Sequence, residues 1–351
     1  MQLLENIPLA PLTTFKIGGP ARYFVEAGTI AELQEAVAFA HSRSLPLFVL
    51  GGGSNLLVAD EGWPGLVLKI AIQGIEQRSG HDEDGKALFD VGAGESWDKF
   101  VSRAVMARCA GVECLSGIPG SVGGTPVQNV GAYGQEVSET IASVQVLDLR
   151  DGQVRELCDE ACGFGYRTSI FNTSERGRFI VLRVTYALTP GGSPRITYAD
   201  LKRHFVGRET SPDLAETREA VRHIRALKGM LIVPGDPNSQ SAGSFFKNPV
   251  LTEDQHEALR KRAAARGLTL PSYPALETRK KVSAAWLVER SGFTRGFGSG
   301  PVGISSKHAL AIVNRGGATA ADILALKEQI QQRVEEIWGI DLEPEPVMVG
   351  F

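Results

Sequence analysis

The stretch SGIPGSVGGTPVQNVGAYG, residues 116–134, contains six glycines, and together with a second glycine run, LGGGSN at residues 50–55, it decides the fold. Glycine reaches positive φ at little steric cost and lets the backbone approach a ligand closely. LGGGSN follows the apolar run LPLFVL, which predicts a buried strand. Backbone amides in such loops can bind phosphate oxygens without lysine side chains. The two loops therefore predict the two sides of one site for a nucleotide diphosphate.

Neither loop matches a standard nucleotide fingerprint. The spacing G-x-G-x-x-G of Rossmann domains is absent from both, and the chain contains no G-x-x-x-x-G-K-[ST] phosphate loop. Taken alone, either glycine run could be only the tight turn at the end of a strand. Their joint occurrence favours a nucleotide site of another kind.

Two other stretches place a single reactive group beside aromatic residues. GFGYRTSIFN at 163–172 contains Arg167, whose guanidinium can hold a carboxylate through two parallel N–H groups, although a surface arginine is the alternative. QSAGSFFKNP at 240–249 contains Ser244, which could be an ordinary loop residue because glycine, serine, asparagine and proline are common in turns. No G-x-S-x-G motif surrounds Ser244, so it is a poor candidate for a hydrolase nucleophile.

The stretch DLEPEPVMVGF near the C-terminus predicts a short strand, and its two prolines favour an edge position. Alternation along a strand would place Glu343 and Glu345 on the same face. Edge-strand charges that deter aggregation are the alternative reading of these glutamates.

Composition and charge exclude several classes of protein. A net charge of -3 and a pI near 6.1, with both signs mixed along the chain, argue against nucleic-acid binding. The four cysteines lack paired C-x-x-C spacing and the six histidines lack ligand spacing, so we expect neither a disulfide framework nor a catalytic metal. The N-terminal residues show no signal-peptide pattern, and no apolar run reaches the roughly 18 to 20 residues of a spanning helix. We expect a cytoplasmic protein without membrane insertion.

The order of predicted elements indicates an α+β protein in two halves. Thr29 and Glu32 have the spacing of a capping box for a helix over 29–43. The dipeptide Asp-Gly at 151–152 predicts a hairpin between the strands VQVLDL and QVREL. Beyond LTPGGSPR at 188–195, a candidate domain boundary, the periodicity becomes mainly helical.

The motifs LGGGSN, SGIPGSVGGTPVQNVGAYG, GYRTSIF, SAGSFFKNP and LEPE occur in the order found in UDP-N-acetylenolpyruvoylglucosamine reductases, and the chain resembles that family over nearly its whole length. The resemblance implies a two-subdomain FAD-binding region of the vanillyl-alcohol-oxidase type over residues 1–190, divided near residue 60. An α+β substrate-binding domain over 191–351 would follow. Its last strand, 343–351, would return to the flavin site.

The resemblance also implies the cofactors and the reaction. FAD would be bound without a covalent link, since neither glycine loop contains a histidine, and NADPH would donate the hydride. The substrate would be UDP-N-acetylglucosamine enolpyruvate, converted to UDP-N-acetylmuramate for the bacterial wall. Hydride would reach the terminal vinyl carbon and leave negative charge spread into the adjacent carboxylate, which the site must stabilise.

Site residues follow from the matching motif positions. Arg167 would stabilise the developing charge, Glu345 would polarise the substrate carboxylate, and Ser244 would protonate the neighbouring carbon. The residues implied to bind the flavin are Leu50, Gly51, Gly52, Gly53, Ser54, Asn55, Gly117, Ile118, Pro119, Gly120, Ser121, Gly123, Gly124, Thr125, Asn129, Gly131, Ala132 and Tyr133. The residues implied to bind the substrate are Gln128, Tyr166, Tyr198, Lys228, Asn248 and Tyr273, with Tyr198 on the tyrosine loop of the first class of these reductases.

Two other functions stay open. An FAD-dependent alcohol or sugar oxidase of the same superfamily would also need both glycine loops. A non-catalytic nucleotide-binding protein would also need both glycine loops, but it would carry out no redox reaction. Oxygen consumption on an alcohol would indicate the former, and a protein that cannot be loaded with FAD would indicate the latter.

Overall fold

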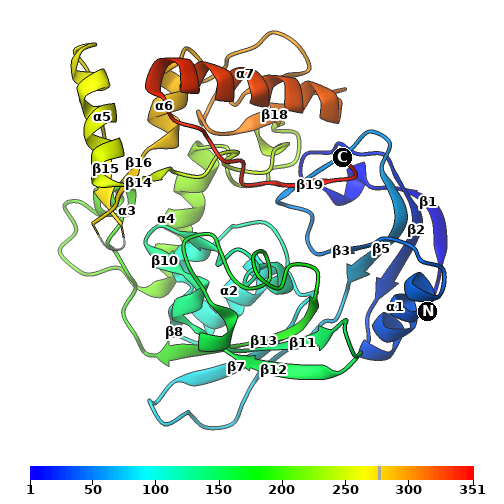
Figure 1. The fold of residues 1–351 in the computed structure, drawn as a ribbon. Helices are drawn as coiled ribbons and strands as arrows, with labels where there is room; N and C mark the ends of the chain where they lie inside the picture. The colour runs from blue at the N-terminus through cyan, green and yellow to red at the C-terminus, as the bar shows by residue number, and fades with distance from the viewer. Residues whose placement is uncertain (276–277) are drawn as a thin grey trace. The chain divides into compact units, whose positions relative to one another are not determined.

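The structure is a computed structural model that describes residues 1–275 and 278–351 (Figure 1). The chain forms two compact units. The larger unit comprises Met1–Ile7, Ala21–Gly53 and Trp63–Leu227, and the smaller unit comprises Pro8–Pro20, Ser54–Gly62 and Lys228–Phe351. The boundary expected between residues 190 and 191 lies inside the larger unit. The assignment of one region to flavin and the other to substrate remains a prediction.

The first sheet has the strand order β1-β2-β5-β3, and β2 and β3 each pair with β5 in parallel. Its strands are β1 (Leu4–Pro8), β2 (Pro20–Ala27), β3 (Leu47–Leu50) and β5 (Trp63–Ile70). Helix α1 (Ile30–Ser42) begins after Thr29, whose side chain forms the predicted capping box with Glu32. Its buried residues, Leu33, Ala36 and Ala40, belong to the core of the larger unit.

The second sheet is antiparallel, with the order β12-β11-β13-β7-β6 and a short strand β8 that also pairs with β13. Its strands are β6 (Ile75–Gln77), β7 (Ala87–Gly92), β8 (Cys109–Ala110), β11 (Ile141–Asp148), β12 (Val154–Cys158) and β13 (Phe179–Pro190). The predicted hairpin joins β11 to β12, and Gly152 adopts a φ of 72° in its turn.

Helix α2 (Trp97–Met106) packs on this second sheet (Figure 1). The ring of Phe100 lies 6.0 Å from that of Phe89 in β7 and 4.7 Å from that of Tyr186 in β13. The core of the larger unit is therefore built around aromatic contacts between this helix and the sheet.

Helices α3 (Ala199–His204) and α4 (Leu214–Leu227) complete the larger unit, together with the short hairpin of β9 (Gly131–Ala132) and β10 (Gln135–Glu136). A small hydrophobic cluster joins these parts. Its buried members are Cys114, Tyr133, Leu201, Ala220, Val221 and Ile224. Residues 191–227 thus pack on the second glycine loop and extend the larger unit.

In its described residues, the smaller unit contains three small sheets and three α-helices. The sheets have the orders β14-β16-β15, β17-β18 and β19-β4. Their strands are β14 (Val250–Leu251), β15 (Ser272–Pro274), β16 (Lys280–Val282), β17 (Val302–Ile304), β18 (Ile312–Asn314), β4 (Leu56–Val58) and β19 (Val347–Val349). The helices are α5 (Glu253–Ala264), α6 (Ala284–Arg290) and α7 (Ala320–Trp338).

The core of the smaller unit includes residues from three distant parts of the chain. Phe15 is fully buried and its ring lies 6.3 Å from that of Phe245. Asn314 in β18 donates a hydrogen bond from Nδ2 to the carbonyl of Phe15 at 2.9 Å. Leu57 of β4 belongs to the same cluster. Residues 8–20 and 54–62 therefore belong structurally with the C-terminal part of the chain.

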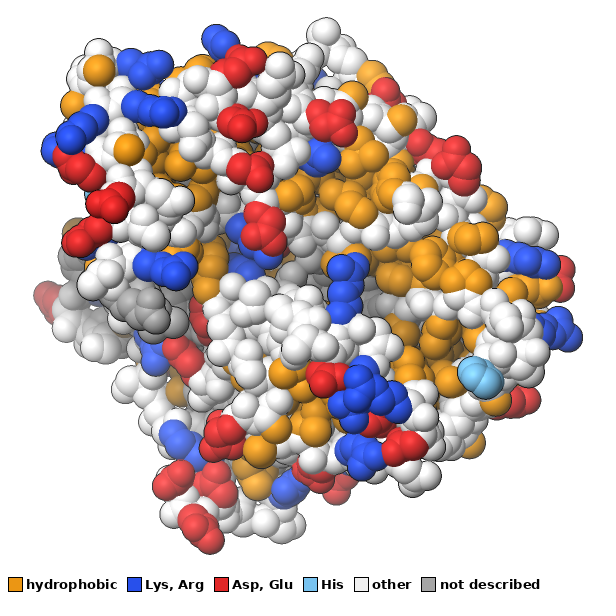
Figure 2. Space-filling view, viewed as in Figure 1, with side chains coloured by type: hydrophobic (Ala, Val, Ile, Leu, Met, Phe, Trp, Pro, Cys, Tyr) orange, Lys and Arg blue, Asp and Glu red, His pale blue; other side chains and the backbone are white. Residues whose placement is uncertain are grey.

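The prediction of an α+β chain is confirmed. The strand expected over 343–351 is shorter, since β19 covers only Val347–Val349. Pro344 and Pro346 lack the N–H groups that would extend its ladder. Lysine and arginine side chains are interspersed with aspartate and glutamate on the face that Figure 2 displays. Among the described helices, none has the length and apolarity needed to cross a bilayer.

Candidate active site

The two glycine loops contact each other within the larger unit. A Cβ atom added to Gly52 would lie 2.5 Å from the Cα of Gly120, and one added to Gly51 would lie 2.8 Å from Oγ of Ser121. Only glycine permits so close an approach of two backbones. Gly53 adopts a φ of 64°, which also favours glycine. The structure thus brings together residues 50–53 and 117–125, as the sequence predicts.

Two features of these loops suit a bound anion. Oγ of Ser121 is buried and has no hydrogen-bond partner in the described parts of the chain. A Cβ added to Gly124 would meet no protein atom within 4 Å, so the protein itself does not require glycine at this position. A buried hydroxyl without a partner is costly, and a ligand oxygen would satisfy it. The cradle therefore fits the diphosphate of a flavin nucleotide.

Other residues of the second loop bond to the protein itself. Oγ1 of Thr125 lies 2.7 Å from the hydroxyl of Tyr186, and burial raises the pKa of that tyrosine while the hydrogen bond opposes the rise. Nδ2 of Asn129 donates to Oε2 of Glu136 at 2.9 Å and to the carbonyl of Gly165 at 3.0 Å. These side chains stabilise the loop, and the backbone amides of residues 122–125 also donate to protein carbonyls.

Arg167 lies at the tip of a tight turn in the larger unit. Gly165 and Thr168 exchange two backbone hydrogen bonds at 3.0 and 3.2 Å, so Tyr166 and Arg167 form the loop between them. Arg167 adopts a φ of 59°, which is unfavourable for a residue with a side chain. Its Nη2 donates to the carbonyl of Gly131 at 2.8 Å. The guanidinium is thereby attached to the second glycine loop.

Several predicted substrate residues of the larger unit lie beside this turn or this loop. The guanidinium carbon of Arg167 lies 5.5 Å from the ring centre of Tyr166. The rings of Tyr133 and Tyr198 meet edge to face, with 5.3 Å between their centres. Gln128 is half-buried in the second loop. The residues Tyr133 and Tyr198 are therefore in direct contact, although they were predicted from separate motifs.

Ser244 and Glu345 belong to neighbouring segments of the smaller unit. Phe246 and Pro344 form an isolated antiparallel bridge. The N–H of Glu345 donates to the carbonyl of Phe245 at 2.8 Å, and the N–H of Lys247 donates to the carbonyl of Glu343 at 3.0 Å. The motifs SAGSFFKNP and LEPE therefore run side by side.

The environment of Ser244 leaves its hydroxyl available. Gly243 adopts a φ of 77°, while Phe245 and Phe246 are buried at 0% and 2% exposure. The N–H of Phe245 donates to the carbonyl of Leu310 at 2.8 Å. The hydroxyl of Ser244 has no hydrogen-bond partner among residues 1–275 and 278–351. The main chain therefore fixes this segment without using the hydroxyl.

Asn55, predicted to bind flavin, bonds to the segment of Glu345. Its Nδ2 donates to the carbonyl of Glu345 at 3.1 Å, and its own carbonyl accepts from the N–H of Val347 at 2.9 Å. The carbonyl of Ser54 accepts from the hydroxyl of Thr14 at 3.3 Å. The end of the first glycine motif thus positions the segment that contains Glu345 and leads into β19.

The remaining predicted residues of the smaller unit have varied surroundings. Oδ1 of Asn248 accepts from the N–H of Ala284 and so satisfies the first turn of α6. Lys247 pairs with Glu343, with 2.5 Å between Nζ and Oε1. Tyr273 is 55% exposed in β15, and Lys228 is the first residue of the last segment of this unit.

Sequence reasoning missed a charged cluster around Asp98 at the start of α2. Its carboxylate accepts from Arg218 at 2.7 Å, from Arg222 at 2.8 Å and from the N–H of Gly117 at 2.6 Å. Burial opposes ionisation of Asp98, but the hydrogen bonds from Arg218 and Gly117 outweigh it and hold the pKa of the carboxyl below its ordinary value. Nε of Arg225 donates to the carbonyl of Gly117 at 3.1 Å. The three arginines are spaced so that they share one face of α4, and this spacing could have indicated the charged cluster from the sequence.

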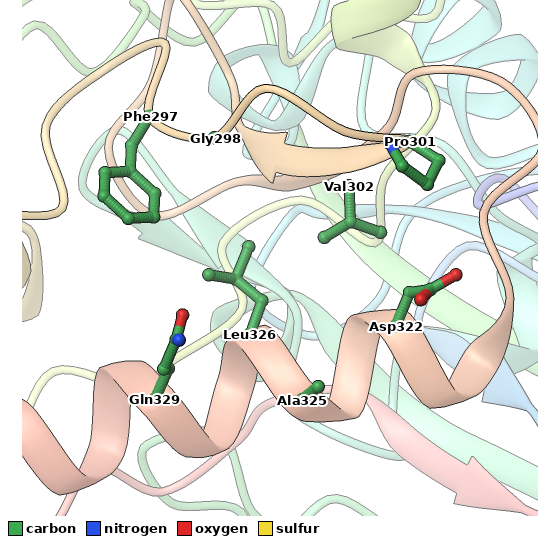
Figure 3. Close-up of a pocket in the computed structure, with 8 residues that line it drawn as sticks. All are labelled: Phe297, Gly298, Pro301, Val302, Asp322, Ala325, Leu326 and Gln329. Carbon is green, nitrogen blue, oxygen red and sulfur yellow. The ribbon is translucent and has the colours of Figure 1, made fainter.

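A shallow pocket of about 260 Å³ lies in the smaller unit between α7 and the residues that precede β17 (Figure 3). Phe297, Val302 and Leu326 form its apolar side. The carboxylate of Asp322 at its edge already accepts from the N–H and hydroxyl of Thr319 in the capping box of α7. None of the residues that line this pocket is a predicted site residue.

Comparison with known families extends over most of the chain. The sequence model of the UDP-N-acetylenolpyruvoylglucosamine reductase C-terminal domain matches residues 236–349, and that of an FAD binding domain matches residues 21–157. The latter match confirms a flavin-binding region in the N-terminal half.

Individual proteins are similar to the chain over its whole length. The UDP-N-acetylenolpyruvoylglucosamine reductase of Thermobifida fusca is 46% identical, with 99% of this chain and 98% of the relative covered. The UDP-N-acetylenolpyruvoylglucosamine reductase of Streptomyces coelicolor is 47% identical, with 100% of this chain and 91% of the relative covered. The crystal structure of the Thermus caldophilus UDP-N-acetylenolpyruvylglucosamine reductase is 28% identical and matches with a TM-score of 0.65, covering 99% of this chain and 98% of that one.

Proposed function

This chain belongs to the UDP-N-acetylenolpyruvoylglucosamine reductases, and we propose that it reduces UDP-N-acetylglucosamine enolpyruvate to UDP-N-acetylmuramate with NADPH as the hydride donor. It is an FAD-dependent oxidoreductase. We further propose that it acts in the cytoplasm, in the synthesis of peptidoglycan precursors. The roles proposed for Ser244 and Glu345 are supported mainly by one observation. Backbone pairing places the Ser244 segment beside the Glu345 segment.

Residues 50–53 and 117–125 would hold the flavin diphosphate. The close approach of Gly52 to Gly120, the unsatisfied hydroxyl of Ser121 and the open space beside Gly124 support this role. When bound, the flavin supplies two-electron chemistry, accepting a hydride from the nicotinamide and delivering it to carbon. Non-covalent attachment is proposed because both loops lack histidine.

Arg167 would bind the carboxylate of the enolpyruvyl group. Addition of hydride to the terminal carbon breaks the carbon–carbon π bond and moves its electron pair toward the adjacent carbon and carboxylate. A fixed guanidinium stabilises such charge more in the transition state than in the ground state. The hydrogen bond from Arg167 to the carbonyl of Gly131 supports a fixed position.

Ser244 would donate the proton that completes the reaction. The electron pair left on the carbon next to the carboxylate takes up this proton, which forms the second carbon–hydrogen bond. Glu345 would polarise the same carboxylate. These roles are supported by the hydroxyl of Ser244, which has no partner among the residues that the structure describes, and by the hydrogen bond from Glu345 to Phe245.

The proposed function is tested by the absorbance of the purified protein without oxygen. The flavin bands should bleach on addition of NADPH and return on addition of the enolpyruvyl nucleotide. Reduction by an alcohol, followed by oxygen consumption without NADPH, would instead indicate an oxidase. A colourless protein that cannot be loaded with FAD would contradict both enzymes.

A further inference from the structure

Glu113 is a fully buried carboxylate that has no role in the reaction described above. It lies in the short 3-10 turn Glu113–Leu115. Its Oε2 accepts from the N–H of Gly111 at 2.8 Å, while Oε1 accepts from Nε2 of Gln135 at 2.7 Å and from the N–H of Arg195 at 2.9 Å. Because a buried charge is costly, these N–H groups are what keep the carboxylate stable. The carboxylate thereby connects three separate parts of the larger unit.

The segment around Arg195 is held mainly by such polar contacts. Residues 192–197 form neither helix nor strand. The carbonyl of Arg195 accepts from Sγ of Cys114 at 3.1 Å, and its Nη1 donates to the carbonyl of Gly134 at 3.0 Å and to Glu139 at 2.7 Å. Among these anchors, Glu113 and Cys114 are fully buried, whereas the side chain of Glu139 is 41% exposed, so the first two hold the segment from the interior of the unit.

This segment leads directly to Tyr198. A Cβ added to Gly134 would lie 2.5 Å from Oγ1 of Thr197, so the segment also lies close against the end of the second glycine loop. The ring of Tyr198 contacts that of Tyr133, yet the residue remains 44% exposed. Tyr198 therefore contacts the second glycine loop through its ring while part of its surface stays exposed.

We propose that Glu113 is a positioning residue for the nucleotide substrate. By holding the backbone of Arg195, it sets the place of Tyr198 beside the second glycine loop before substrate arrives. A preorganised side chain binds a ligand more tightly than one that must first be ordered. The inference rests on the proposed function, because Tyr198 is assigned to the substrate there.

The test is Glu113→Gln. The amide keeps the size of the side chain but replaces one acceptor oxygen with an NH2 group, which then faces an N–H donor. The KM for the enolpyruvyl nucleotide should rise about tenfold, the effect of losing one hydrogen bond to a charged group. The flavin content, the rate of flavin reduction by NADPH and kcat should each stay within about twofold of the wild type.

Two comparisons separate positioning from general stability. Glu139→Gln changes the exposed partner of the same arginine and should alter the nucleotide KM by less than about twofold, since exposed ion pairs contribute little. In Tyr198→Ala, addition of Glu113→Gln should raise the nucleotide KM no further, because Glu113 acts through Tyr198. Equal additional loss in the presence and absence of Tyr198 would overturn the proposal.

A measurement on the unchanged protein covers the case in which Glu113→Gln does not fold. Hydrogen exchange should show the amide of Arg195 to be slower than the other amides of residues 191–197. Exchange as fast as that of its neighbours would refute the inference. Failure of the proposed function is separately visible, because the wild type would then not be reoxidised by the enolpyruvyl nucleotide.

Discussion

The Arg167 turn and the Ser244 segment both present one reactive group, but they fix it by different means. Arg167 adopts a left-handed backbone and is attached through its side chain, by the bond from Nη2 to Gly131. Ser244 follows a left-handed glycine and is flanked by backbone hydrogen bonds, and its hydroxyl has no partner within the described parts of the chain. A stabilising charge can be bound by protein groups without losing its function, whereas a proton donor must keep its hydroxyl available.

Of the substitutions that test this comparison, Ser244→Ala should have the largest effect. The backbone ladder does not need the hydroxyl, so the variant should fold, bind FAD and be reduced by NADPH at the wild-type rate. Its reoxidation by the enolpyruvyl nucleotide should fall by roughly two to four powers of ten, as on loss of a positioned general acid. Stopped-flow absorbance of the two half-reactions measures both rates.

Ser244→Cys serves as the matched control for the missing hydroxyl. It should recover part of the rate, since a thiol is a stronger acid of similar shape. Reoxidation of the alanine variant at the wild-type rate would leave Ser244 as an ordinary loop residue.

Arg167→Lys should slow the same half-reaction by about two to three powers of ten. The charge remains, but the planar group that can bind Gly131 and a carboxylate together is lost. Flavin reduction by NADPH should continue at the wild-type rate. If both half-reactions slow equally in stopped-flow experiments, the arginine has a binding or folding role instead.

Gly124→Val extends the comparison to a position without a side chain. A Cβ atom added to Gly124 would lie within 4 Å of no protein atom, so we expect the variant to unfold at about the same temperature as the wild-type apoprotein. Its affinity for FAD should fall by about one to two powers of ten, because the side chain occupies the space of the ligand. Flavin fluorescence titration measures the affinity, and Gly300→Val is the control, because a Cβ added at Gly300 also has no protein atom within 4 Å. Unchanged affinity would place the diphosphate elsewhere.

Asp98→Asn tests whether the ion pairs of the Asp98 side chain stabilise the fold, because their contribution to the free energy of unfolding depends on pH. Since the pKa of Asp98 is lowered in the folded state, its stabilisation is fully present above the ordinary value of 3.8 and is lost as pH falls through the lower folded-state value. At pH 7 the variant should lose about 1.5 kcal/mol of unfolding free energy. Urea denaturation at several pH values should show this difference shrinking below pH 3.8. A constant difference would contradict the ion-pair explanation.

Lys247→Met should have the smallest effect. It removes the ion pair with Glu343, whose side chain is 71% exposed, and it keeps the backbone hydrogen bond between these residues. We expect a loss of less than about 1 kcal/mol of unfolding free energy and a reoxidation rate within about twofold. A large loss of rate would show that the main chain alone does not hold the Ser244 segment.

Local chemistry explains which elements could be predicted. The capping box of Thr29 and Glu32 and the Asp-Gly turn at 151–152 depend on neighbouring residues, and both occur as expected. The proximity of the glycine loops was also predictable, because two runs with the same property suggest one site. The strand expected over 343–351 is shorter in the structure because Pro344 and Pro346 have no N–H group to donate to a neighbouring strand.

Contacts between distant residues could not be predicted in this way. The bonds from Arg195 to Glu113 and from Arg218 to Asp98 join ordinary residue types across more than 80 positions. No local periodicity records such a pairing. For the same reason, no local pattern predicts that residues 8–20 and 54–62 belong with the C-terminal part of the chain.

The pairing of β4 with β19 has a consequence for synthesis on the ribosome. Asn55 and Glu345, at the adjoining ends of these strands, are 290 residues apart in the chain. During translation, Leu56–Val58 therefore emerges long before its partner and must wait with unpaired backbone groups. Closing so large a loop is slow, and exposed strand edges favour aggregation in the interval. The nascent chain is thus expected to depend on chaperones until Val347–Val349 has been made.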